Sequence, residues 1–312
     1  MLINENEFIW VEKYRPQTLN DLILPKDIKD NFKSFIESGK IPNILLTSSN
    51  PGLGKTSIAK ILAKETNADF MTMNGNLDTG VDLMRTRVMD FCSAGSFDNS
   101  PKILLIDEAE NLSPNSLASV KTTIETFTNV SFIFTANYVN KIPEPVRNRM
   151  LAFNFDEIYS NNKPEILKEI AKRLIFILQN ENVEFQRDDI PKIIKLFYPS
   201  VRGMIQNLQR YTFDSKLRID DSIKESSNMF NLLVESIKNK DFKEMRKISN
   251  NILDCGAFYE YMFRNIDIIK DETKPECILI LARYQNMSET ARDKLITLCA
   301  CCIELMSKCK FE

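Results

Sequence analysis

Residues 44–56 read Ile-Leu-Leu-Thr-Ser-Ser-Asn-Pro-Gly-Leu-Gly-Lys-Thr, and this stretch decides the fold. The short apolar run 44–46, followed by polar residues, predicts a buried strand of a parallel sheet. After the glycines, Ile58, Ile61 and Leu62 recur at helical spacing. A strand, a glycine-rich loop and a helix in this order predict a phosphate-binding P-loop.

The predicted P-loop carries the groups that bind a polyphosphate. Its glycines let backbone N–H groups converge on the phosphates, and the dipole of the following helix adds positive potential there. Lys55 would reach the β- and γ-phosphates, and the Thr56 hydroxyl would hold Mg²⁺. The first glycine of the motif is replaced by Ser49. The alternative, a flexible Gly/Ser linker, does not explain the buried strand and the amphipathic helix on either side.

Two acidic residues follow a second apolar run, 103–106. This pattern predicts a buried strand that ends in Asp107 and Glu108, and ligands of open parallel sheets bind at the carboxyl ends of the strands. Asp107 would orient hydrated Mg²⁺, and Glu108 would polarise a water for in-line attack on the γ-phosphate. The alternative is a surface turn, where acidic residues are common, and the P-loop upstream argues against it.

Polar residues also follow a third apolar run, 131–136. Asn137 comes directly after it and could bind the attacking water or the γ-phosphate, although an asparagine at a strand end is usually a turn former. Arg147 and Arg149 lie just beyond a helix start marked by Pro143. Such arginines are normally solvated, but so near a nucleotide sheet one of them could serve the γ-phosphate of a neighbouring subunit.

Composition limits the remaining chemistry. The chain has 312 residues, a net charge of −2, seven cysteines and no histidine. The lack of histidine excludes Ser-His and Cys-His catalysis and the common zinc sites, and the scattered cysteines predict core thiols in a reducing cytosol. No apolar stretch approaches the ~18 residues of a membrane span, and no signal-peptide pattern is present. We therefore expect a cytoplasmic protein without membrane contact, in which any nucleic-acid contact uses a local basic patch.

The remaining segments predict how the chain is divided. The strap 8–25 is expected to be ordered but non-helical, and the alternation of strands and helices stops after Phe155. Beyond it we expect helices over 163–180, 188–197 and 201–211, a connector over 212–227, and five helices from 228 to 308 with a break at 286–288. Three domains follow: 1–157, 158–225 and 226–312.

Taken together, these motifs resemble the AAA+ clamp loaders of DNA replication. The resemblance rests on the P-loop, on Trp10-Val-Glu-Lys-Tyr-Arg-Pro16, on Asp107-Glu-Ala-Glu110, on Thr135-Ala-Asn137 and on the helix that starts at Val201-Arg202. The motif W-x-E-K-Y-R-P at residues 10–16 is highly specific for this family. The resemblance implies an α/β P-loop AAA+ domain, a parallel sheet with flanking helices, followed by a helical lid and an all-α collar that serves oligomerisation.

The family implies roles for individual residues, with ATP and Mg²⁺ as ligands. Asn137 resembles sensor 1 and Arg202 resembles sensor 2, while Arg149 resembles an arginine finger that acts in trans. An arginine in the first turn of a helix is opposed by the dipole, so the place of Arg202 also hints at an anion. The residues implied to border the nucleotide are Glu12, Lys13, Tyr14, Ile23, Gly52, Leu53, Gly54, Lys55, Thr56, Ser57 and Arg202.

The family also implies partners. Its members form five-subunit rings, here with further copies of this chain and a small accessory subunit, and they hold a sliding clamp open for primer–template DNA. Arg85, and more weakly Lys121, match positions that face the DNA backbone, which gives sequence-independent, salt-sensitive binding. The segment 91–97 is a candidate contact with the clamp.

Several positions depart from the family pattern. The finger motif, usually Ser-Arg-Cys, reads Asn148-Arg149-Met150 and leaves Arg147 as a possible substitute. Glutamines that relay DNA binding to hydrolysis are replaced by Leu117 and Ala118. Ser49, Leu24-Pro25 and an Asn-, Ile- and Lys-rich composition favour the large subunit of loaders from T-even-type bacteriophages over cellular loader subunits.

We therefore predict an ATPase motor subunit of a clamp loader. One alternative is a loader subunit that binds clamp and partners but hydrolyses nothing; such subunits normally lose the P-loop lysine or the acidic pair, and both are present here. The other is a different AAA+ machine, such as a replication initiator or helicase loader. Initiators usually append a DNA-reading winged helix or helix-turn-helix, and residues 228–312 show no hairpin pattern or basic recognition helix.

Overall fold

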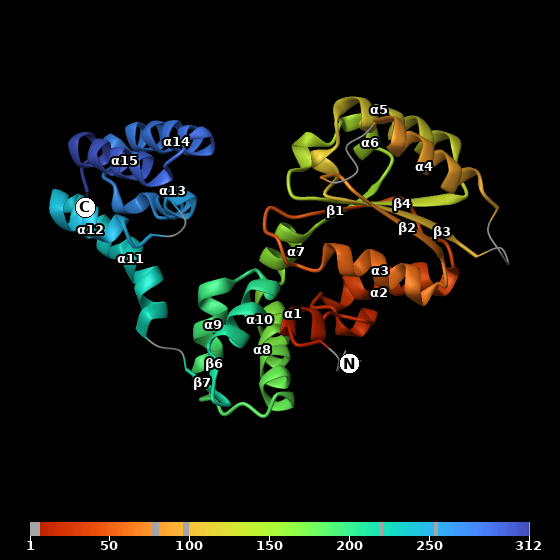
Figure 1. The fold of residues 1–312 in the computed structure, drawn as a ribbon, viewed down its shortest axis with the longest axis horizontal. Coiled ribbons are helices and arrows are strands. Elements are labelled where there is room, and N and C mark those ends of the chain that lie inside the picture. Colours follow the sequence, from red (N-terminus) through yellow and green to blue (C-terminus); the bar gives the residue numbers. More distant parts are fainter. Residues whose placement is uncertain (1–6, 77–80, 96–99, 219–220, 253–254, 312) are drawn as a thin grey trace. The chain divides into compact units, whose positions relative to one another are not determined.

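The computed structural model describes residues 7–76, 81–95, 100–218, 221–252 and 255–311 (Figure 1). The chain divides into two compact units, Met1–Arg218 and Ile219–Glu312. The first unit contains the first predicted domain, 1–157, and the second, 158–225, up to Arg218. The predicted boundary at 226 falls inside helix α11 (Asp221–Lys238), and the division into three domains stays a prediction.

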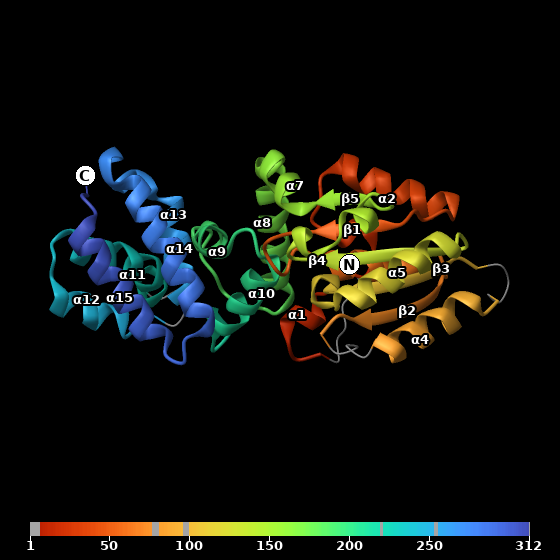
Figure 2. The ribbon, with the colours of Figure 1, turned by 90° about the horizontal axis from the view of Figure 1, so that it is seen from above.

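The first unit is built on a five-stranded parallel sheet. Its strands are β1 (Ile44–Thr47), β2 (Asp69–Asn74), β3 (Lys102–Asp107), β4 (Val130–Ala136) and β5 (Leu151–Asn154). Their order is β2-β3-β4-β1-β5, and Figure 2 shows them side by side in this sequence. Every pairing is parallel, so the carboxyl ends of all five strands lie at one edge. The predicted α/β class with a parallel sheet is confirmed.

Helices cover both faces of this sheet (Figure 1). Side chains of α4 (Val81–Ser93) and α5 (Pro114–Thr126) share a buried cluster with Leu104, Phe132 and Phe134 of the strands. Helices α2 (Lys26–Ser38) and α3 (Lys55–Glu65) lie on the opposite face. Helix α2 ends at Gly39, whose φ of +63° forms the left-handed C-cap that glycine favours. The short helix α6 (Glu144–Arg147) leads from β4 toward β5.

After β5 the first unit continues with helices. These are α7 (Phe155–Asn161), α8 (Lys163–Asn180), α9 (Asp189–Phe197) and α10 (Val201–Arg210). Helix α8 turns its buried face of Ile166, Ile170, Leu174, Ile177 and Leu178 inward. The N-terminal strap was predicted to be non-helical, and this is wrong in part. It forms a helical turn, α1 (Trp10–Lys13), because Glu12 and Lys13 are good helix formers, and this turn stops before Pro16 because a residue preceding proline disfavours the helical conformation. A short 3-10 turn follows over Leu19–Asp21.

The predicted connector 212–227 is also wrong. Its first residues form a small antiparallel hairpin, β6 (Thr212–Phe213) with β7 (Lys216–Leu217), and α11 already begins at Asp221. The turn uses Asp214 and Ser215 at φ of 50° and 56°, a conformation that aspartate tolerates better than most residues. No glycine marks this turn, so the strongest signal of a hairpin is missing from the sequence.

The second unit is helical throughout its described part, apart from one isolated bridge between Ile269 and Phe311. Its helices are α11, α12 (Phe242–Ser249), α13 (Cys255–Arg264), α14 (Lys274–Thr290) and α15 (Lys294–Lys308). The predicted break at 286–288 is wrong, since α14 runs through it; Asn and Ser weaken a helix only slightly. All seven cysteines are free, and all but the half-buried Cys299 are buried. Among the described helices, none has the length and apolarity needed to cross a bilayer.

Candidate nucleotide-binding site

The P-loop takes the conformation that its glycines allow. Gly52 and Gly54 have φ of +83° and +94°, values that residues with a side chain rarely adopt. A Cβ atom at Gly52 would lie 2.7 Å from the Cβ of Arg202, and the Arg202 N–H donates to the Gly52 carbonyl at 3.3 Å. The loop therefore packs directly against the first turn of α10, and Gly54 caps the start of α3.

Lys55 and Asn137 meet at the sheet edge. The Lys55 ammonium donates to Asn137 Oδ1 at 2.9 Å, and the carbonyl oxygens of Ser48 and Asn50 lie 3.4 and 3.5 Å away. Lys55 is 8% exposed. Burial lowers its pKa from the ordinary value, against the carboxylates of Glu110, Asp156 and Asp107, which raise it. The ammonium lies where the motif predicts contact with the β- and γ-phosphates.

Asp107 is fixed by two hydroxyl groups. Its Oδ1 accepts from Thr56 Oγ1 at 2.8 Å and from Thr135 Oγ1 at 2.6 Å. The Thr135 oxygen in turn accepts the N–H of Glu108 at 2.9 Å. Thr56 and Asp107 thus place two oxygens side by side at the loop, which is the hard-oxygen donor set that Mg²⁺ prefers. The two residues predicted to hold the metal fit it.

The carboxylate of Glu108 is held by the amide of Asn76, which donates to Oε2. Asn76 follows β2, and Glu108 follows β3, its neighbour in the sheet. The backbone of Glu108 is left-handed, with φ of 55°. Farther along, Glu110 accepts the N–H of Asn137 at 2.9 Å through Oε1, while its buried Oε2 has no partner among the described residues.

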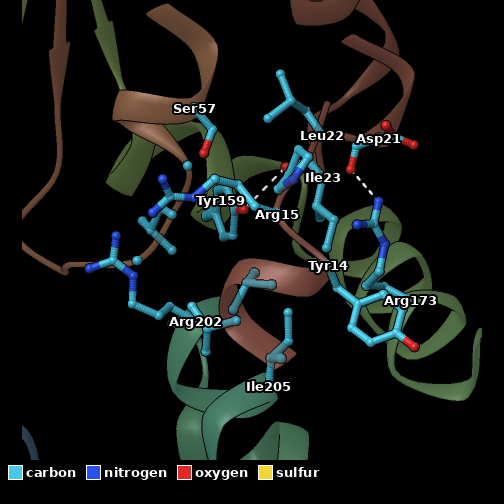
Figure 3. Close-up of a pocket in the computed structure, with 16 residues that line it drawn as sticks. Tyr14, Arg15, Asp21, Leu22, Ile23, Ser57, Tyr159, Arg173, Arg202 and Ile205 are labelled. Carbon is cyan, nitrogen blue, oxygen red and sulfur yellow. Dashed lines mark hydrogen bonds between the residues drawn. The ribbon is translucent and has the colours of Figure 1, made fainter. Parts of the chain in front are cut away.

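A cleft of about 590 Å³ opens beside the P-loop (Figure 3). Its walls come from the strap, the P-loop and helices α7, α8 and α10. Residues of the P-loop and of the first turn of α10 both line it, so the predicted phosphate-binding loop faces this cleft. The lining residues are Val11, Tyr14, Arg15, Pro16, Asp21, Leu22, Ile23, Gly52, Leu53, Gly54, Ser57, Tyr159, Arg173, Val201, Arg202 and Ile205.

Two of the strap residues predicted at the adenine, Tyr14 and Ile23, line this cleft. Glu12 and Lys13 make other contacts, Glu12 with Arg15 at 2.9 Å and Lys13 with Glu181 at 2.6 Å. The strap is therefore bonded to the helical segment that follows the sheet.

Three further contacts hold the cleft together. The Tyr14 hydroxyl donates to Glu181 Oε1 at 2.5 Å, and burial, with this hydrogen bond, raises the Tyr14 pKa. The buried Tyr159 hydroxyl donates to the Ile23 carbonyl at 3.1 Å. Arg173 of α8 donates to the Asp21 carbonyl, a contact drawn in Figure 3.

The structure places Arg149 apart from the cleft. Its guanidinium pairs with Glu125 of α5 at 2.5 Å and donates to the Pro145 carbonyl at 2.5 Å. Arg147, the possible substitute, has a buried Nε without a partner among the described residues. Since Arg149 is exposed, it is accessible to another subunit.

The predicted DNA contacts are only partly described. The side chain of Arg85, on α4, and residues 96–97 of the candidate clamp segment lie outside the described residues, and Lys121 is half-buried on α5. Leu117 is buried in the cluster between α5 and the sheet, whereas Ala118 is exposed.

Sequence reasoning missed Asn76, Asp156 and the role of Thr135. Asn76 and Asp156 follow the carboxyl ends of β2 and β5. The rule that located Asp107 and Asn137, that polar residues at these ends converge, would have found both. Arg15, Tyr159 and Arg173 carried no signal of their own, because they reach the cleft only through tertiary packing.

Comparisons with known proteins agree with this geometry. Residues 45–157 match the family "ATPase family associated with various cellular activities (AAA)". The chain is similar to the sliding-clamp-loader large subunit of Enterobacteria phage T4, with 34% identity over 79% of this chain and 79% of that protein. It is 28% identical to a replication factor C small subunit of Sulfurisphaera tokodaii, over 84% and 81% of the two chains.

Among solved structures, the Thermotoga maritima RuvB Holliday junction branch migration motor matches with a TM-score of 0.53. Its sequence is 17% identical, and the match covers 80% of this chain and 85% of that one. At this identity the likeness concerns the fold alone.

Proposed function

The chain belongs to the sliding-clamp-loader family of AAA ATPases, and from this premise we propose that it is the subunit whose ATP hydrolysis is triggered by a sliding clamp and primer–template DNA. One observation carries the proposal: Lys55 bonds Asn137 and Thr56 bonds Asp107 directly beside the P-loop glycines that line the cleft. Binding, metal and water-sensing groups therefore share one sheet edge.

Each residue has a task in this proposal. Lys55 binds the β- and γ-phosphates and offsets charge that develops in the transition state. Asn137, held by Glu110, orients the attacking water or the γ-phosphate. Glu108 accepts a proton from that water once Asn76 releases its carboxylate. Mg²⁺, held by Thr56 and Asp107, supplies Lewis-acid stabilisation of the phosphate oxygens when bound.

The cleft supplies the remaining contacts with ATP. The base lies between the strap and helices α7, α8 and α10, bordered by Tyr14 and Ile23, and the P-loop with Arg202 takes the phosphates. We keep residues 158–225 as a lid on this site. Because the strap is bonded to α8 and α10, movements of the lid carry the strap along.

The active form in this proposal is an assembly. Arg149 reaches the γ-phosphate of a neighbouring subunit, in a five-subunit ring of copies of this chain and a small accessory subunit joined by residues 226–312. The ring holds the sliding clamp, and Arg85 and Lys121 bind the phosphates of primer–template DNA without reading its sequence. The exposed guanidinium of Arg149 supports a role in trans.

The test is ATP turnover of the full chain with its accessory subunit, clamp and primed DNA, measured by phosphate release. Glu108→Gln should leave ATP binding and assembly intact and abolish turnover, because the amide cannot accept the proton. Lys55→Ala should weaken ATP binding, whereas Lys60→Ala, an exposed lysine on the same helix, should not. Near-normal turnover of Glu108→Gln would overturn the proposal. Absence of ATP hydrolysis by the wild-type chain, as expected of a non-hydrolysing loader subunit, would overturn it as well.

A further inference from the structure

The P-loop departs from its motif at Ser49, and the structure shows what holds that position. The Ser49 N–H donates to Asp156 Oδ2 at 2.7 Å. The neighbouring Ser48 hydroxyl, which is buried, lies 3.1 Å from Asp156 Oδ1 and 2.8 Å from the Asn50 carbonyl. The Asp156 carboxylate thus accepts hydrogen bonds from both Ser48 and Ser49 at the start of the loop.

The position of Asp156 follows from the sheet. Strand β5 lies beside β1, with Asn154 in register with Thr47, so the residues that follow the two strands emerge side by side. Asn154 Oδ1 accepts the Asp156 N–H at 3.1 Å and caps α7. The backbone of Asp156 is therefore fixed independently of its contacts with the P-loop.

Helix α7 carries both Asp156, which bonds the P-loop, and a residue that lines the cleft. Asp156 lies in its first turn, and Tyr159, one turn later, lines the cleft and bonds the Ile23 carbonyl. Helix α8 follows directly. The segment that leaves the sheet for the lid thus contacts both the start of the P-loop and the base end of the cleft.

The charge of Asp156 also acts on the site. It is one of the carboxylates that raise the pKa of Lys55 against the effect of burial. A second cleft of about 740 Å³, lined among others by Ser49, Asn137 and Lys141, leaves the carboxylate accessible. A substitution at Asp156 can therefore be accommodated without repacking the core.

We propose that Asp156 is a positioning residue for nucleotide binding: its carboxylate sets the entrance of the P-loop, where the motif lacks its first glycine, and ties that entrance to the lid. The inference rests on the proposed ATP site. Without the acceptor, the Ser48–Ser49 backbone loses the contact that orients the loop, and the N–H groups that follow no longer converge on the phosphates before binding. The carboxylate of Asp156 is bonded to Ser48 and Ser49, so in this proposal it acts through the loop.

The test compares two variants that remove the same charge. Asp156→Asn keeps an acceptor for the Ser49 N–H, and Asp156→Ala does not. Isothermal titration calorimetry of the full chain with ADP and with ATPγS should give dissociation constants about fivefold higher for the alanine variant than for the asparagine variant, the order expected for one neutral hydrogen bond. The turnover rates of complete loaders that contain one or the other variant should differ less than twofold at saturating ATP, since Asp107 and Glu108 are unchanged in both.

Equal dissociation constants for the two variants would overturn the inference. Thermal unfolding followed by Trp10, the single tryptophan of the chain, shows whether both are folded. If Asp156→Ala does not fold, Asp156→Ser, whose side chain is too short to reach Ser49, replaces it in the same comparison. Lys55→Ala measured in parallel separates the two claims. If Lys55→Ala binds both nucleotides like wild type, the proposed site itself is wrong. If Lys55→Ala binds more weakly but the two Asp156 variants have equal dissociation constants, the site stands and the positioning role is wrong.

Discussion

Thr135→Val replaces a buried hydroxyl behind the acidic pair by a methyl group of nearly the same size. Thr135 is 2% exposed. Its hydroxyl donates to Asp107 Oδ1 and accepts the N–H of Glu108. The substitution therefore removes two hydrogen bonds while keeping the shape of the side chain, and it affects both acidic residues at once.

The cost can be worked out from these contacts. A hydrogen bond to a charged group contributes about 1.5–3 kcal/mol, and the lower end applies because the half-buried Asp107 can recruit water. The unpartnered N–H of Glu108 costs about 1 kcal/mol more, and the added methyl returns about 0.8 kcal/mol. We expect a net loss of about 2 kcal/mol in the free energy of unfolding of the first unit. With a urea dependence of about 3 kcal/mol per molar, the unfolding midpoint falls by about 0.6 M.

Trp10 fluorescence reports on this unit alone, because no other tryptophan exists in the chain. Urea unfolding of the full chain should show the lower midpoint for Thr135→Val, and Thr135→Ser, which keeps the hydroxyl, should restore most of it. The Mg²⁺ concentration needed for half-maximal ATP turnover should rise for the valine variant, since Asp107 loses a contact that orients it. A valine variant with unchanged midpoint and unchanged Mg²⁺ requirement would refute the assigned role of this hydroxyl.

Three further predictions concern the charged groups. Arg149→Ala should slow turnover of the assembled loader about 10³-fold, by analogy with other arginine fingers; if Arg147→Ala has this effect instead, the finger is misassigned. Burial lowers the pKa of Lys55, so ATP affinity measured by calorimetry should fall with rising pH before an ordinary lysine deprotonates, and a flat profile up to pH 10 would contradict this. Asn76→Ala should raise phosphate release in the absence of DNA, because the amide no longer holds Glu108; unchanged basal release would exclude that restraint.

The sequence predicted the parts of this fold that depend on local patterns. The apolar runs 44–46, 103–106 and 131–136 are strands because each is long enough only for a buried strand and ends in polar residues. The same logic brought Asp107 and Asn137 to one sheet edge, since all the strands are parallel.

The contacts that the sequence did not predict join residues far apart in the chain. Asn76 and Glu108 are 32 positions apart, and Ser49 and Asp156 are 107 apart. Only the strand order brings them together, and periodicity does not determine that order. The helix α14 runs through 286–288, where the residue types predicted a break. Here a local pattern was misleading, because weak helix formers are tolerated where tertiary packing holds both ends of a helix.

The structure gives a reason why this site would depend on several partners. Most of the groups assigned to phosphate, metal, water or a neighbouring subunit are bonded to another protein side chain. These pairs are Lys55–Asn137, Thr56–Asp107, Glu108–Asn76 and Arg149–Glu125. In the proposed assembly, ATP would offer partners for the first pair and the metal for the second, whereas Glu125 would have to release Arg149 to a neighbouring nucleotide. Since exposed ion pairs contribute only about 0–1 kcal/mol, breaking the Arg149–Glu125 pair would cost little, and we expect that assembly rather than ATP alone would decide when this pair breaks.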